Sequence, residues 1–144
     1  MRCLFTGRLC PDLLTDLDLI TPALDGTILP GITRDCILKL AAAHSPNNSS
    51  SDALSPTIPK LHVQERIFTI DDLCLWLKAG VLLETFGTGT ASILCPVSKI
   101  GYDGRDLDLP TYDGGVGPVS MALWERMVEI QEGKRNSQWL VPCE

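Results

Sequence analysis

The chain lacks several features that would point to particular classes of protein. No apolar run approaches the roughly 20 residues that a membrane-spanning helix needs. Basic residues are outnumbered, with 12 Lys and Arg against 18 Asp and Glu and a formal net charge of −6 at pH 7. They are also scattered, so we expect neither a nucleic-acid nor a membrane partner. The first ten residues hold no continuous apolar stretch, which predicts no signal or transit peptide.

Closely spaced cysteine pairs are missing too. The six cysteines include no C-x-x-C pair, which argues against a structural zinc site and does not imply a disulfide framework. We therefore expect no metal site and an intracellular chain, cytoplasmic or mitochondrial, whose thiols are reduced and mostly buried. His44 and His62 are the only histidines. A functional histidine is one alternative, and a solvated histidine is the expectation for each.

The sequence does contain the periodic patterns of a folded domain. Its 144 residues are 44% hydrophobic, enough to form the core of a single domain spanning residues 1–144. Apolar periodicity and turn residues predict alternating strands and helices, which favours a mixed α/β fold. The expected strands are 4–5, 17–20, 61–68, 82–86, 91–97 and 139–141, and the expected helices are 34–43, 69–79 and 118–132. Residues 87–90 (GTGT) are expected to break the strand that precedes them.

A few short signals mark the ends of these elements. Thr69 and Asp72 have the spacing of a capping box at a helix start. The pair Asp103-Gly104 predicts a hairpin turn, and Pro118 is favoured at the first position of a helix. The apolar residues of the last helix should share one buried face: Val119, Leu123, Met127 and Ile130.

Residues 44–59 differ in composition from the rest of the chain. They are rich in Ser, Asn and Pro and nearly free of bulky apolar side chains, so they cannot bury enough surface to order themselves. We expect a mobile surface loop that lies away from any site and is cut first in limited proteolysis. The strand after it, 61–68, is expected to bury Leu61, Val63 and Ile67.

Two segments have the chemistry of an anion site. Gly31-Ile32-Thr33 follows a Pro-Gly turn and opens a helix, whose first N–H groups have no intrahelical partner. Residues 87–91 (GTGTA) are small, so their backbone can approach a ligand closely. Thr33 and Thr90 would add hydroxyl donors. Taken alone, the first segment is more often plain helix capping and the second is more often a simple turn.

The residues around these segments resemble the branched-chain amino acid aminotransferases, which are class IV pyridoxal-phosphate-dependent enzymes. The resemblance extends from about residue 19 to residue 139. Its anchors are residues 24–34 (LDGTILPGITR), 68–73 (FTIDDL), 84–91 (ETFGTGTA), 95–97 (CPV), 117–118 (GP) and 130–131 (IQ). The resemblance implies the large C-terminal domain of the fold-type IV enzymes, a mixed sheet or barrel with packed helices, without the small N-terminal domain. It also implies homodimers that transfer an amino group between leucine, isoleucine or valine and 2-oxoglutarate.

The resemblance assigns roles to the matched residues. Leu29 would lie beside the pyridine ring of pyridoxal phosphate, and Ile32 and Thr33 would bind its phosphate. Gly89 and Thr90 would complete that phosphate cup. Thr90 and the N–H of Ala91 would receive the substrate carboxylate. Where some members carry a redox-active C-x-x-C pair, this chain has Ser92 and Cys95, so we expect no such switch and a packed Cys95.

The lysine that binds the cofactor covalently in this family has no match in the chain. The five lysines present, at 39, 60, 78, 99 and 134, fall at non-catalytic positions, so no catalytic residue is assigned. We expect a fragment that is truncated at its N-terminus and inactive alone. One alternative is a residual domain that binds anions or a partner without catalysis. Another is a class IV relative with a different substrate, such as a D-amino acid aminotransferase or an aminodeoxychorismate lyase, which the 24–31 and 68–73 strings disfavour.

Overall fold

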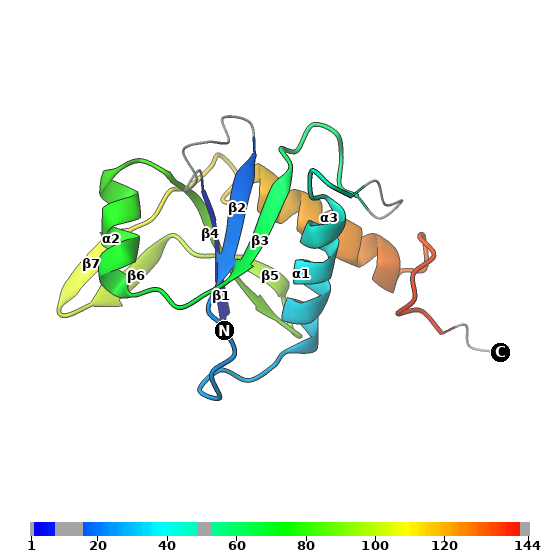
Figure 1. The fold of residues 1–144 in the computed structure, drawn as a ribbon, viewed down its shortest axis with the longest axis horizontal. Coiled ribbons are helices and arrows are strands. Elements are labelled where there is room, and N and C mark those ends of the chain that lie inside the picture. The colour runs from blue at the N-terminus through cyan, green and yellow to red at the C-terminus, as the bar shows by residue number, and fades with distance from the viewer. Residues whose placement is uncertain (1, 8–15, 49–52, 142–144) are drawn as a thin grey trace.

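A computed structural model describes residues 2–7, 16–48 and 53–141 (Figure 1). Within these ranges a five-stranded sheet has the order β3-β2-β1-β4-β5. Its strands are β1 Arg2–Gly7, β2 Leu17–Thr21, β3 Leu61–Glu65, β4 Leu82–Gly89 and β5 Ile93–Pro96. Strands β2 and β3 pair in parallel, and the other neighbours are antiparallel. The helices are α1 Ile32–Ala43, α2 Ile70–Lys78 and α3 Pro118–Gln131, and a hairpin joins β6 Lys99–Tyr102 to β7 Arg105–Asp108. The mixed α/β prediction is confirmed.

The main core forms where α1 and α3 pack against the sheet (Figure 1). Helix α1 connects the parallel strands β2 and β3, as a crossover between parallel strands usually does. The predicted face of α3 is buried, and Phe86 of β4 lies fully buried in the same cluster. A smaller cluster on the side of α2 contains Leu73, Leu82 and Leu109. Because α1 and β4 both pack in the main core, the start of α1 and the end of β4 are fixed relative to each other.

The predicted end signals are present. Thr69 Oγ1 accepts a hydrogen bond from the N–H of Asp72, whose carboxylate accepts from the N–H of Thr69, so the capping box forms. The turn of the β6–β7 hairpin has φ of 49° at Asp103 and 70° at Gly104, the left-handed pair that a two-residue hairpin turn requires.

Removing the Thr69 cap gives a direct test of where α2 begins. We expect Thr69→Ala to lower the free energy of unfolding by about 1 kcal/mol, because the first turn loses its side-chain acceptor. Urea denaturation followed by far-UV circular dichroism measures the loss. Thr57→Ala, in a loop where the residue caps no helix, is the matched control. Equal losses in the two variants would contradict the role of the cap.

Two predicted boundaries and one predicted strand are wrong. β4 does not break at Gly87 but continues to Gly89, because β1 and β5 pair with it on both sides and this pairing outweighs the low strand propensity of glycine. β3 ends at Glu65, so Ile67 is 81% exposed instead of buried. Residues 139–141 form no strand; the N–H of Leu140 instead bonds Ser137 in a turn.

The expectation for His44 is also wrong. Its side chain is 1% exposed, and its Nε2 lies 2.9 Å from the carbonyl oxygen of Ile58. Leu54 is buried in the main core as well, so the segment 44–59 is anchored by its few apolar residues. The prediction of mobility falls partly on residues 49–52, which lie outside the described residues. Cys95, expected to be packed, is exposed.

Candidate functional site

The two segments singled out from the sequence line one cleft. The start of α1 contributes Leu29, Gly31, Ile32, Thr33 and Arg34, and the end of β4 contributes Thr88, Gly89 and Thr90. The cleft has a volume of about 200 Å³. Segments far apart in the sequence therefore lie side by side, as the resemblance requires for a shared phosphate cup.

The α1 side of the cleft is an open helix N-terminus. Gly31 is the N-cap in an extended conformation and gives no side-chain cap, so the first N–H groups of α1 remain available to a ligand. Upstream, Asp25 Oδ1 accepts hydrogen bonds from the hydroxyl and the N–H of Thr27, at 2.6 and 2.9 Å. These bonds hold the pKa of Asp25 below its ordinary value and stabilise the turn that leads into Leu29.

The β4 side offers a hydroxyl and an open space. Thr88 is 5% exposed, and its Oγ1 is buried without a hydrogen-bond partner among the described residues. A Cβ added to Gly89 would meet nothing within 4 Å, so the space above this backbone is free. A buried unpaired hydroxyl beside an open glycine is the arrangement expected where a polar ligand completes the site. Sequence reasoning missed Thr88 because it placed residues 87–90 in a loop instead of a strand.

Arg34 is the second residue that sequence reasoning missed. Its side chain is 5% exposed, and its guanidinium donates to Thr21 Oγ1 at 3.4 Å, to the carbonyl of Pro22 at 2.9 Å and to Glu65 Oε2 at 2.6 Å. From the sequence, Arg34 is only the last residue of the 24–34 string and the first residue of the predicted helix 34–43. Its burial could not be read from the sequence, because its partners lie on β2, the segment after β2, and β3.

All but one of the residues predicted for the site line the cleft. Leu29, Ile32, Thr33, Gly89 and Thr90 all line the cleft, whereas Ala91 is exposed in the turn after β4 and is not among the lining residues. No lysine lines the cleft in the part of the chain that is described. Across the described ranges, no group of three His, Cys, Asp or Glu side chains could hold a metal ion. Nor is any described helix long and apolar enough to span a membrane.

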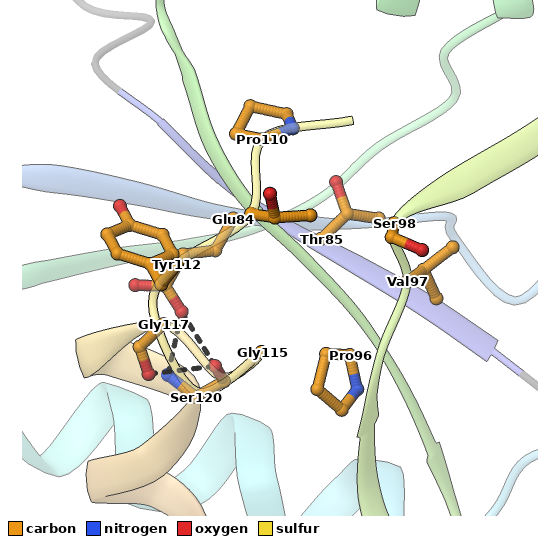
Figure 2. Close-up of a pocket in the computed structure, with 11 residues that line it drawn as sticks. Glu84, Thr85, Pro96, Val97, Ser98, Pro110, Tyr112, Gly115, Gly117 and Ser120 are labelled. Carbon is orange, nitrogen blue, oxygen red and sulfur yellow. Dashed lines mark hydrogen bonds between the residues drawn. The ribbon is translucent and has the colours of Figure 1, made fainter. Parts of the chain in front are cut away.

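A second cavity, of about 20 Å³, lies between β4 and the start of α3 (Figure 2). Glu84 is 4% exposed there and accepts hydrogen bonds from the N–H groups of Val119 and Ser120 and from Ser120 Oγ, at 2.9, 2.9 and 2.7 Å. Burial, followed by the negative charge of Glu84, raises the pKa of Tyr112 above its ordinary value. The carboxylate caps α3 through these three hydrogen bonds, and the cavity has room for about one water molecule.

Comparison with known proteins finds relatives among the aminotransferases. The cytosolic branched-chain-amino-acid aminotransferase of Mus musculus is 39% identical over 124 residues, which are 86% of this chain and 28% of that protein. The chain is a relative of the branched-chain-amino-acid aminotransferases. Other relatives of that name are mitochondrial, one of them from Saccharomyces cerevisiae. No family model matches the chain. The chain spans less than a third of the length of these curated relatives.

Solved structures show that the fold is shared with these enzymes. The branched-chain amino acid aminotransferase of Escherichia coli superposes with a TM-score of 0.59 at 25% identity, over 96% of this chain and 35% of that one. An aminotransferase from Brucella abortus, bound to the cofactor PLP, gives a TM-score of 0.55 at 23% identity, over 92% of this chain and 34% of that one. The chain therefore shares part of the fold of these aminotransferases.

Proposed function

We propose that the cleft binds the phosphate of pyridoxal 5'-phosphate. The observation that carries the proposal is the convergence of the uncapped α1 N-terminus with Thr88 and the open space over Gly89 on one cleft. N–H groups of a helix N-terminus, hydroxyls and a close glycine backbone together form a site for a phosphate ester. The fit is good for the phosphate and poor for the rest of the cofactor, because no lysine lines the described cleft.

The assignments by residue follow from this proposal. Ile32 and Thr33 donate backbone N–H groups and Thr33 its hydroxyl, while Gly89 and Thr90 complete the cup. Leu29 is exposed at the edge of the cleft and would lie beside the pyridine ring. Thr90 and Ala91 are assigned to the substrate carboxylate. When bound, the cofactor supplies the electron sink on which an amino group is transferred; the residues named here hold it and orient it.

The parent reaction is proposed by kinship with the named relatives. It is amino transfer between leucine, isoleucine or valine and 2-oxoglutarate, in a homodimer located in the cytosol or the mitochondrion. For the 144-residue chain we propose phosphate-ester binding without turnover, because the described cleft contains no lysine. Purified chain with pyridoxal phosphate, leucine and 2-oxoglutarate is expected to form no more glutamate than a heat-treated sample. Turnover above that level would contradict the proposal.

The two threonine hydroxyls provide the test of the binding site. We expect Thr33→Val and Thr90→Val each to weaken pyridoxal phosphate binding by about 10- to 150-fold, since a hydrogen bond to a charged group contributes roughly 1.5–3 kcal/mol. Isothermal titration calorimetry measures the affinity, and inorganic phosphate should compete. Thr57→Val, outside the cleft, is the control. If the parent chain binds and neither cleft variant is weaker, the phosphate is held elsewhere.

A further inference from the structure

We propose that the ion pair between Arg34 and Glu65 tunes the anion affinity of the cleft, with Arg34 raising it and Glu65 holding it down. The inference rests on the proposed phosphate site and concerns how strongly that site binds. The two charged side chains differ in burial and in whether they line the cleft. Arg34 lines the cleft and is 5% exposed, whereas Glu65 ends β3, is 47% exposed and is not among the lining residues.

Arg34 does not depend on Glu65 alone for its position. Two of its three acceptors are uncharged, the hydroxyl of Thr21 and the carbonyl of Pro22. A neutral amide at position 65 still offers an oxygen to the guanidinium. Arg34 should therefore keep its place when the carboxylate is neutralised. For an anion in the cleft, the substitution then removes the negative charge of Glu65 and leaves the positive charge of Arg34 in place.

Arg34 is the buried positive charge at the cleft, and the ion pair next to it on α1 is exposed. Asp35, in the first turn of α1, is ion-paired with Lys39 at 2.7 Å, and both side chains are more than half exposed. Charges so exposed are strongly screened by water and salt. Arg34 is instead buried beside the helix N-terminus, where its field adds to that of the helix dipole. An anion should therefore respond more to Arg34 than to the surface charges, and Glu65 matters through its direct 2.6 Å contact with Arg34.

The test is whether neutralising Glu65 raises the affinity of the cleft for pyridoxal phosphate. Glu65→Gln is expected to tighten pyridoxal phosphate binding by about 3- to 10-fold at 0.05 M ionic strength, the range for neutralising one partly screened charge. At 0.5 M the gain should fall below about 2-fold because salt screens it. Glu125→Gln, an exposed residue on α3, changes the net charge equally and should leave the affinity within about 2-fold. A lost salt bridge that mattered only for structure would weaken binding, not strengthen it.

A second pair of variants tests the same idea from the other side. Arg34→Lys keeps the charge without the guanidinium fork and should bind within about 3-fold of the parent chain, whereas Arg34→Met should lose about 10-fold or more. Thermal melting of each variant is measured alongside the affinity. Equal losses in the two folded variants would overturn the inference, since geometry and not charge would then matter.

The failure of this inference can be told apart from failure of the proposed function. If the parent chain binds neither pyridoxal phosphate nor inorganic phosphate, the phosphate site itself is wrong and the tuning role falls with it. If the parent binds and Glu65→Gln binds equally or more weakly, the site stands and only the tuning role is overturned. Tighter binding in Glu65→Gln, lost at high salt and absent in Glu125→Gln, supports both.

Discussion

Replacing Gly89 by valine is expected to abolish pyridoxal phosphate binding while the chain stays folded. The new side chain would occupy the open space over the β4 backbone, where a Cβ meets nothing within 4 Å, and this space is where the proposed phosphate lies. Gly89 has no left-handed φ, and valine suits a strand. We expect a loss of at least about 100-fold by calorimetry, because several donors in the cup become inaccessible at once.

A matched glycine exists in the hairpin. Gly101 of β6 also has no left-handed φ, and a Cβ there would meet only an oxygen of Asp106 at 3.7 Å. Gly101→Val should therefore fold and bind like the parent chain. Gly89→Ala, with a single methyl group, should give an intermediate loss. Unchanged affinity in a folded Gly89→Val variant would show that the ligand does not approach β4.

The parts of the fold that could be predicted are those encoded by neighbouring residues. The capping box at Thr69, the hairpin at Asp103-Gly104 and the buried face of α3 each depend on a spacing of a few residues, and all three form. The cleft could be predicted because two strings, 24–34 and 84–91, carry a specific resemblance. Local chemistry and family resemblance thus gave the elements and the main lining residues.

The parts that could not be predicted depend on partners distant in the sequence. Gly87 and Gly89 look like a break until β1 and β5 pair with both edges of β4. His44 lies in a polar segment, and its burial requires Ile58 and the core to cover it. Arg34 and Thr88 gain their positions only when the strands are assembled. His44, Arg34 and Thr88 are polar residues whose surroundings are set by tertiary contacts.

The second large effect is expected at the junction of β4 and α3, where Glu84 caps the helix (Figure 2). Glu84→Ala would leave two buried N–H groups and the hydroxyl of Ser120 without this acceptor. Unpaired buried donors and the loss of a cap together lower the free energy of unfolding by about 3–5 kcal/mol. Urea denaturation, with sucrose added where a variant is only marginally stable, measures the loss.

Gly117 should be energetically coupled to this carboxylate. A Cβ at Gly117 would overlap the side chain of Glu84, which three hydrogen bonds hold in place, so Gly117→Ala must displace the cap and should lower the unfolding free energy by about 2–4 kcal/mol. In the double variant the shortened residue 84 leaves room for the methyl group. The second substitution should then add less than about 1 kcal/mol, a coupling of roughly 1.5–3 kcal/mol in the double-mutant cycle. Additive losses would mean that Gly117 is required for the backbone alone and not to admit the carboxylate.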